Sequence, residues 1–105
     1  MNNRPSIDTI KRLVAPAFGV SVCDLDSHRR DASTALGRHV AMFLAREMTL
    51  SSLPAIGRRF GDKDHTTVMY AVRRIRRLVA AESGMAAVVA GLRSALTPTQ
   101  REDAA

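Results

Sequence analysis

Two amphipathic segments meet in the stretch SLPAIGRRFGDKDHTTVMYAVRRI, residues 52–75. Ser52 is a good N-cap and predicts a short helix that ends at Gly61, with an apolar face made of Leu53, Ile56 and Phe60. The sequence GDKD at 61–64 is typical of a tight turn. Asp64 then caps a longer predicted helix over 64–80, whose buried face comprises Val68, Val72, Ile75 and Val79. A helix pair joined by a short glycine-containing turn is a helix-turn-helix candidate.

Upstream of this pair, the hydrophobic periodicity predicts two more helices. The first has Ser6 as its N-cap, ends at Gly19 and contains Pro16, which should kink it or loosen its last turn. The second runs from about residue 34 to residue 48, with an apolar face of Leu36, Val40, Phe43, Leu44 and Met48. Between them we expect a turn over 21–27, with room for one helical turn, and a polar, basic loop over 28–34.

Downstream of the pair, Ser83 and Gly84 interrupt the pattern, and a last helix is predicted over 85–96, with apolar positions at Met85, Val88, Val89, Leu92 and Leu96. The sequence has no alternating strand pattern of useful length and no internal repeat. We therefore expect an all-α fold, a bundle of five to six helices that contains a helix-turn-helix. It should form one domain over 6–96, between a flexible N-terminus at 1–5 and a flexible tail at 97–105.

The composition fits one globular domain with an aliphatic core. Of the 105 residues, 46% are hydrophobic and 25% charged, but only 4% are aromatic. A single cysteine, Cys23, excludes an internal disulfide and a cysteine-based zinc site, and we expect it to be a small buried residue. Arg12 and Pro16 break the first apolar stretch, so we expect no secretory signal, and no apolar run approaches the ~18 residues needed to span a bilayer. These features predict a soluble, cytoplasmic protein.

The charge points to a polyanionic partner. Sixteen Lys and Arg residues stand against ten Asp and Glu, for a net charge of +6, and fourteen of the sixteen are arginine. Between Arg29 and Arg77, eleven basic residues stand against four acidic ones, an excess of +7. Arginine makes planar, bidentate contacts to phosphates and guanine edges. Nucleic acid is therefore the first candidate partner, and an anionic membrane surface is the second.

The longer helix of the pair starts with short polar side chains, Asp64, His65, Thr66 and Thr67. Recognition helices place such N-terminal residues on base edges, where Asp can accept from cytosine, His can donate to a purine and Thr can contact thymine. The same residues also suit a plain capped helix start, and the four arginines within 73–77 also suit a solvated helix face. The concentration of positive charge around this helix favours DNA binding.

With these features in place, residues 52–75 resemble the C-terminal DNA-binding domain, domain IV, of the bacterial chromosomal replication initiator DnaA. The resemblance extends upstream through DLDSHRR at 24–30 and GRHVAMFLAREMT at 37–49, and it covers roughly residues 6–96. It implies a stand-alone copy of that domain, which binds DnaA-box-like sites in double-stranded DNA as a monomer on each site. In this family the second helix of the motif enters the major groove, and the basic loop reaches the adjacent minor groove.

The resemblance also implies which residues touch DNA. The implied base contacts, with Arg30 in the minor groove and Pro54 on a thymine methyl, are Arg30, Pro54, Asp64, His65, Thr66 and Met69. The implied contacts to the backbone or to neighbouring bases are Arg29, Arg38, His39, Arg46, Lys63, Thr67 and Arg74. Lys63 stands where the family usually has Arg. Phosphate contacts would set the register and base contacts the sequence preference.

The expected function is the initiation or regulation of DNA replication, at sites shared with a full-length initiator. The sequence holds no GxxxxGK[ST] motif for nucleotide phosphates, so we expect neither ATP binding nor origin melting by this chain. His28, His39 and His65 lack metal-ligand spacing, and we expect no metal, no cofactor, no catalytic residue and no enzyme activity. The expected location is the cytoplasmic nucleoid. A transcriptional regulator with the same DNA-reading motif is the alternative, and a basic helical protein adaptor is a weaker one.

Overall fold

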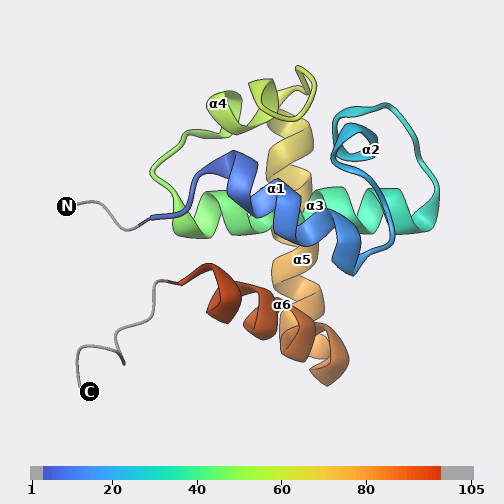
Figure 1. Cartoon of the computed structure of the whole chain (residues 1–105), viewed down its shortest axis with the longest axis vertical. Coiled ribbons are helices and arrows are strands. Elements are labelled where there is room, and N and C mark those ends of the chain that lie inside the picture. The colour runs from blue at the N-terminus through green and yellow to red at the C-terminus, as the bar shows by residue number, and fades with distance from the viewer. Residues whose placement is uncertain (1–3, 98–105) are drawn as a thin grey trace.

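The computed structural model describes residues 4–97, which form six helices and no strand (Figure 1). In chain order the helices are α1 (Ile7–Ala17), α2 (Val22–Asp26), α3 (Ala32–Met48), α4 (Leu53–Arg58), α5 (His65–Ala81) and α6 (Ser83–Leu96). The predicted all-α class, the helical turn within 21–27 and the helix pair within 52–81 are confirmed. The predicted flexibility of residues 1–3 and 98–105 falls outside the described part of the chain.

Helices α3 and α5 cross at the centre of the molecule, and the other helices pack around them (Figure 1). Helix α1 packs along α3, α4 packs on α5, and α6 folds back against α5 and α1. The core is largely aliphatic, as the composition predicts, and its largest fully buried side chains are Phe60, Ile10, Leu25, Met42, Leu44, Ile56, Ile75, Val14, Val40, Val68 and Thr34. Burial of these side chains is the main stabilising contribution to the bundle.

Side-chain caps fix where most of the helices begin. The predicted caps are confirmed, since Ser6 accepts from Thr9 N, Ser52 from Ala55 N and Asp64 from Thr66 N. Ser21 forms a capping box with Asp24 at the start of α2. Each such bond satisfies a backbone N–H that has no partner within the helix.

The start of α3 and the end of α4 differ from the prediction. Helix α3 begins at Ala32, so the loop predicted over 28–34 is shorter, because Asp31 accepts from Thr34 N and caps the helix earlier. Helix α4 ends at Arg58 rather than near Phe60. The Gly57 carbonyl there accepts from both Phe60 N and Lys63 N, which draws the chain into the turn.

A sharp bend joins α5 to α6. The interruption predicted at Ser83 and Gly84 is confined to Glu82, which has extended backbone angles, so α6 begins at Ser83 rather than at Met85. The two helices are bent by 116° relative to each other. Within the described residues, no single helix is long and apolar enough to cross a membrane, and only this bent pair together has the required length and composition.

Two predictions of burial, those of Cys23 and Val79, were wrong, and one predicted apolar position, Val88, is exposed. Cys23 is exposed, because the short helix α2 buries only Leu25 against the core. Val88 is 44% exposed, because the buried residues of α6 are Val89, Leu92 and Leu96. Val79 is only partly buried, near the end of α5.

Candidate nucleic-acid interface

The turn between α4 and α5 is tightly constrained. Gly61 and Asp62 both adopt left-handed backbone angles, with φ of 77° and 58°. A Cβ on Gly61 would lie 2.0 Å from the Asp26 carbonyl oxygen, and one on Gly57 would lie 2.1 Å from the Lys63 carbonyl oxygen. No side chain fits at either glycine without a backbone shift. The turn therefore holds the start of α5 in a fixed position against both α4 and the end of α2.

The start of α5 presents polar side chains to solvent. Asp64 caps the helix by accepting from the backbone N–H and the hydroxyl of Thr66. These bonds, the side-chain one first, hold the pKa of Asp64 below its ordinary value, so the carboxylate is ionised near neutral pH. Its second oxygen lies 3.8 Å from His65 Nδ1. Both side chains are more than half exposed, which leaves acceptor and donor atoms available to a ligand.

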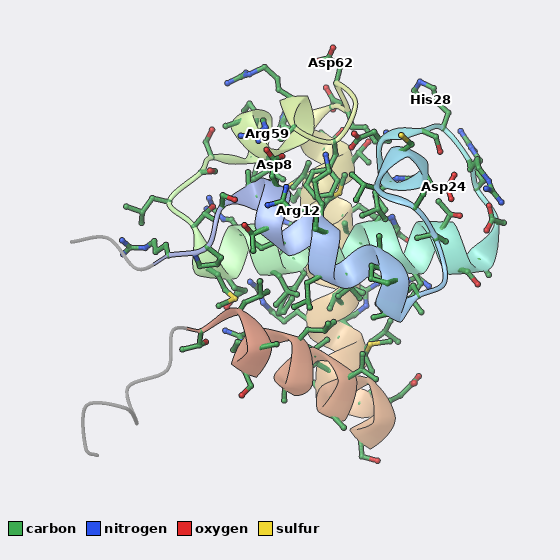
Figure 2. All side chains as sticks on the ribbon, viewed as in Figure 1. Asp8, Arg12, Asp24, His28, Arg59 and Asp62 are labelled. Atoms are coloured by element: carbon green, nitrogen blue, oxygen red, sulfur yellow. The ribbon has the colours of Figure 1, made fainter. Side chains whose placement is uncertain are left out.

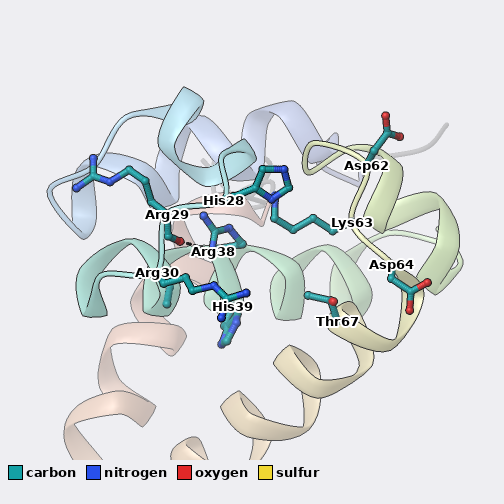
Figure 3. Close-up of a pocket in the computed structure, with 10 residues that line it drawn as sticks. His28, Arg29, Arg30, Arg38, His39, Asp62, Lys63, Asp64 and Thr67 are labelled. Atoms are coloured by element: carbon teal, nitrogen blue, oxygen red, sulfur yellow. Dashed lines mark hydrogen bonds between the residues drawn. The ribbon is translucent and has the colours of Figure 1, made fainter.

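A basic loop lies beside this helix start. Figure 3 shows Arg29 and Arg30 on the loop between α2 and α3, across a hollow from Asp64 and Thr67. Arg29 pairs with Asp24 at 3.2 Å and with Asp31 at 3.0 Å. Arg30 is exposed and has no ion pair within the described residues. The guanidinium of Arg30 is therefore the free cation of the loop.

The hollow between the loop and α5 has a volume of about 460 Å³ and is lined by His28, Arg29, Arg30, Ala35, Arg38, His39, Asp62, Lys63, Asp64 and Thr67 (Figure 3). Residues from the loop, α3, the turn and α5 thus meet around one concave, basic surface. An anionic strand lying in it would face cations on several sides.

Arg38 forms the floor of this hollow, but its donors point into the protein. Only 6% of the residue is exposed. Its Nε donates to the Leu25 carbonyl at 2.9 Å, and Nη1 donates to the Arg29 carbonyl at 3.0 Å. Nη2 donates to two further carbonyls, those of Asp24 at 3.0 Å and Ser27 at 2.9 Å. Four of its five N–H groups are therefore used within the protein.

Lys63 makes similar internal contacts. Its Nζ donates to the Asp26 carbonyl at 3.0 Å and to the Phe60 carbonyl at 2.7 Å. Partial burial lowers the pKa of Lys63, and the nearby Arg38 guanidinium acts in the same direction. The lysine thus joins the end of α2 to the turn of the helix pair.

A buried lysine, absent from the sequence prediction, also joins the end of α2 to the turn of the helix pair. Lys11 of α1 is 4% exposed, and its Nζ donates to the Arg59 carbonyl at 2.6 Å. The same atom lies 2.6 Å from Asp26 Oδ1, without hydrogen-bond alignment, and 4.9 Å from the centre of the Phe60 ring. The only sequence signal is a charged residue directly after Ile10, on an otherwise apolar face.

His39 and Arg74 connect α3 to α5. Arg74 Nη1 lies 3.0 Å from His39 Nδ1, and the His39 ring meets Tyr70 edge-on at 5.7 Å between centroids. Burial, with repulsion from Arg74 and Arg38, lowers the pKa of His39 to about 4. The imidazole is therefore neutral at physiological pH and accepts the hydrogen bond from Arg74.

The remaining predicted contacts lie away from the hollow. Thr66 is exposed beside His65, and Met69 is half-buried one turn further along α5. Pro54 is exposed in the first turn of α4. Arg46 is exposed near the end of α3 and donates to the Ser51 carbonyl at 3.1 Å.

Other charged side chains lie on separate surfaces. Figure 2 shows Asp8 and Arg59 close together on the outside of α1 and α4, where they form a 2.8 Å ion pair. His28 and Asp62 stand at the outer edge of the molecule, on the basic loop and on the turn (Figure 2). Among the described residues there is no group of three or more His, Cys, Asp or Glu that could hold a metal ion.

Comparison with known proteins identifies relatives of this chain. The family model described as the bacterial dnaA protein helix-turn-helix matches residues 7–75. The chromosomal replication initiator protein DnaA of Rhodopseudomonas palustris (strain BisB18) is 52% identical over 82 residues, which is 78% of this chain and 17% of that protein. The same protein of Xanthobacter autotrophicus is 52% identical over 83 residues, 79% of this chain and 16% of that protein. The chain thus spans about a fifth or less of the length of these curated relatives.

Proposed function

The chain belongs to the bacterial DnaA helix-turn-helix family, and from this membership we propose that it binds double-stranded DNA sequence-specifically, at DnaA-box-like sites, in the initiation or regulation of replication. The observation that carries the proposal is the hollow shared by the basic loop and the start of α5. A free arginine lies on one side of it, and exposed donors and acceptors lie on the other.

The two sides of the hollow suit two grooves of one duplex. Asp64, His65 and Thr66 lie at the exposed start of a 17-residue helix, where recognition helices contact base edges in the major groove. Arg30 on the loop suits the adjacent minor groove, whose negative potential attracts arginine where it is narrow. Pro54 and Met69 would add apolar contacts, since both lie on the helix pair.

Polar and basic side chains in and beyond the hollow would bind the phosphates between those grooves. Arg29 and Arg46 are exposed, and Thr67 lines the hollow. Arg74 and His39 lie at the junction of α3 and α5, where Arg74 keeps N–H groups beyond its one bond to His39. Such contacts set the register of the protein on DNA and carry no sequence information.

Site selection from random duplexes, followed by salt titration, tests the proposal. We expect one enriched sequence, and an affinity whose logarithm falls linearly with log salt, at about −0.9 per phosphate contacted. His65→Ala should weaken binding to the selected sequence by roughly 1–3 kcal/mol and leave binding to random DNA nearly unchanged. Arg74→Ala should weaken both alike. A slope near zero, or no enriched sequence, would reject the proposed function.

The place of the sites in a genome separates replication from transcription. Sites clustered at an origin would support a role in replication, at positions shared with a full-length initiator. Occupancy is then set by protein concentration relative to Kd, so excess protein should displace the initiator from shared sites. Sites clustered at promoters would instead support a transcriptional regulator. Genome-wide occupancy mapping with wild-type protein, and with the double variant Arg30→Ala and His65→Ala as control, distinguishes the two.

A further inference from the structure

We propose that Arg38 and Lys63 are positioning residues, which hold the basic loop at a fixed distance from the start of α5 and make no direct contact with DNA. The proposal rests on the proposed function, in which the loop and the start of α5 are the two segments that contact bases. It assigns these cations a role other than the phosphate contact that the family resemblance implies. Its consequence is that sequence preference on the loop side of a site depends on two residues that never touch it.

The first support is that Arg38 organises the end of α2. A helix leaves its last carbonyls without partners, and α2 has only five residues, so most of its carbonyls are in this position. Arg38 donates to the carbonyls of Asp24, Leu25, Ser27 and Arg29, at 2.9–3.0 Å. A cation is also the favoured charge at a helix C-terminus. One planar side chain therefore fixes the path of the backbone from residue 24 to residue 29, directly before Arg30.

The second support is that Lys63 bridges that segment to the helix pair. It donates to the Asp26 carbonyl, the one carbonyl between 24 and 27 that Arg38 does not bind, and to the Phe60 carbonyl of the turn. The residues it joins are 34 positions apart in sequence. Lys63 therefore holds the end of α2 against the turn that leads directly into Asp64.

The third support is that the junction is in direct backbone contact. A Cβ at Gly61 would lie 2.0 Å from the Asp26 carbonyl oxygen, so the turn and the end of α2 touch at that point. Lys11 contacts the same two segments, through Asp26 and the Arg59 carbonyl. The end of α2 and the turn before α5 are thus linked by direct backbone contact and by the side chains of Lys11 and Lys63.

Burial and hydrogen bonding argue against a direct role in phosphate binding. Arg38 is 6% exposed, and four of its five N–H groups donate to backbone carbonyls, so a bidentate phosphate contact would require it to release a carbonyl. The exposed Arg29, on the same loop, is 56% exposed at its side chain and held only by surface ion pairs. Arg29 can rotate to a phosphate at little cost, whereas Arg38 and Lys63 would have to break bonds to backbone carbonyls in order to turn outward.

The experiment compares Arg38→Met and Lys63→Met with the matched exposed variant Arg29→Met, and each is checked first by thermal melting. In DNA-free protein, amide exchange of residues 24–31 should become at least tenfold faster in Arg38→Met and Lys63→Met and stay unchanged in Arg29→Met. On selected duplexes, Arg38→Met and Lys63→Met should lose about tenfold of their preference at base pairs on the loop side and keep it on the α5 side.

Salt dependence distinguishes positioning from phosphate contact. The slope of log affinity against log salt should remain that of wild type for Arg38→Met and Lys63→Met, and it should fall by about 0.9 for Arg29→Met. A slope reduced by about 0.9 in Arg38→Met and Lys63→Met, with unchanged exchange at 24–31, would overturn the proposal and support direct contact. Uniform loss of preference across the whole site would overturn it too.

A conservative variant keeps the test decisive if a methionine variant does not fold. Arg38→Lys retains the charge but cannot reach four carbonyls from one nitrogen, so we expect the same faster exchange at 24–31 and the same one-sided loss of preference. Wild-type behaviour of Arg38→Lys in both measurements would reject the positioning role. If wild-type protein selects no sequence at all, the proposed function fails, and the exchange of 24–31 still reports whether the junction exists.

Discussion

At its start, α5 is surrounded by polar contacts, whereas its far end, together with α6, is held mainly by apolar side chains. Around residues 57–64, carbonyl oxygens accept hydrogen bonds from two lysines and from backbone N–H groups. Around α6, the buried residues are Val89, Leu92 and Leu96, and Glu82 provides no side-chain cap. Asp64 does cap α5.

The two ends contribute differently to the geometry of the candidate site and to the stability of the fold. Hydrogen bonds are directional and fix distances between segments, while apolar burial depends on area and tolerates small shifts. We therefore expect the polar end to determine where the proposed base-contacting side chains lie. We expect the apolar end to contribute more to the free energy of unfolding. Each prediction below tests that separation, from the largest expected effect to the smallest.

Replacing a glycine should have opposite effects at the two ends. Gly61→Ala puts a Cβ into left-handed backbone and against the Asp26 carbonyl, so we expect a loss of about 3 kcal/mol or more of folding free energy. Gly91→Ala in α6 meets no atom within 4 Å and should stabilise the protein by about 0.5–1 kcal/mol. Urea unfolding of both variants measures the difference, and equal effects would contradict the comparison.

Truncation in α6 should change stability without changing DNA preference. Leu92 is 9% exposed, and Leu92→Ala should cost about 2–3 kcal/mol of folding free energy. Binding measured at a temperature where the variant remains folded should keep the wild-type ratio of selected to random duplex. A reduced ratio would show that α6 also positions the reading side chains.

Acid should weaken the junction of α3 and α5 through His39. Its pKa in the folded protein is about 4, below the ordinary 6.5, so the folded state favours the neutral ring. The contribution of this ring to stability is fully present above pH 6.5 and is lost as the pH falls from 6.5 through 4. Because the ring is only partly buried, we expect a loss of about 1–2 kcal/mol.

Urea unfolding from pH 7.5 to pH 4 measures this loss, with His39→Gln as the non-titrating control. Asp24, Asp31 and Asp64 have lowered pKa values, each held down first by a hydrogen bond, from Ser21, Thr34 and Thr66 respectively. Their contributions decline at acid pH in both proteins and cancel in the difference. Parallel curves for wild type and variant would show that His39 is not the group responsible.

A cap added to α6 should have the smallest effect. Glu82→Asp keeps the negative charge at the helix N-terminus and shortens the side chain to a length that caps well. We expect a gain of about 0.5–1 kcal/mol, read from the thermal midpoint, with no change in DNA binding. The reverse change at the polar end, Asp64→Glu, should lower both stability and base preference.

Local signals in the sequence were enough to predict most of the fold. Ser6, Ser52 and Asp64 were identified as caps because each precedes an apolar pattern of helical period. Asp31 was missed, because the polar residues that follow it gave no such pattern until Leu36. Glu82 is a weak cap residue, so the start of α6 had no distinct signal.

The surroundings of the cations could not be predicted in the same way. Arg30 and Arg38 are the same residue type in the same basic region, yet one is exposed and the other donates to four carbonyls. Those carbonyls belong to backbone groups, which every residue carries, so no residue type marks them in the sequence. Lys11 was missed because its partners, the Asp26 carboxylate and the Arg59 carbonyl, lie 15 and 48 positions away in the sequence.

The exposed side chain of Cys23 has a practical consequence for any measurement on the purified protein. It is the sole thiol of the chain, and it stands on α2, near the basic loop. Two copies can join through it in air, so a dimer seen without a reductant would reflect oxidation rather than assembly. The same thiol accepts a maleimide dye at a single defined position, and its fluorescence would report a duplex arriving at the neighbouring loop.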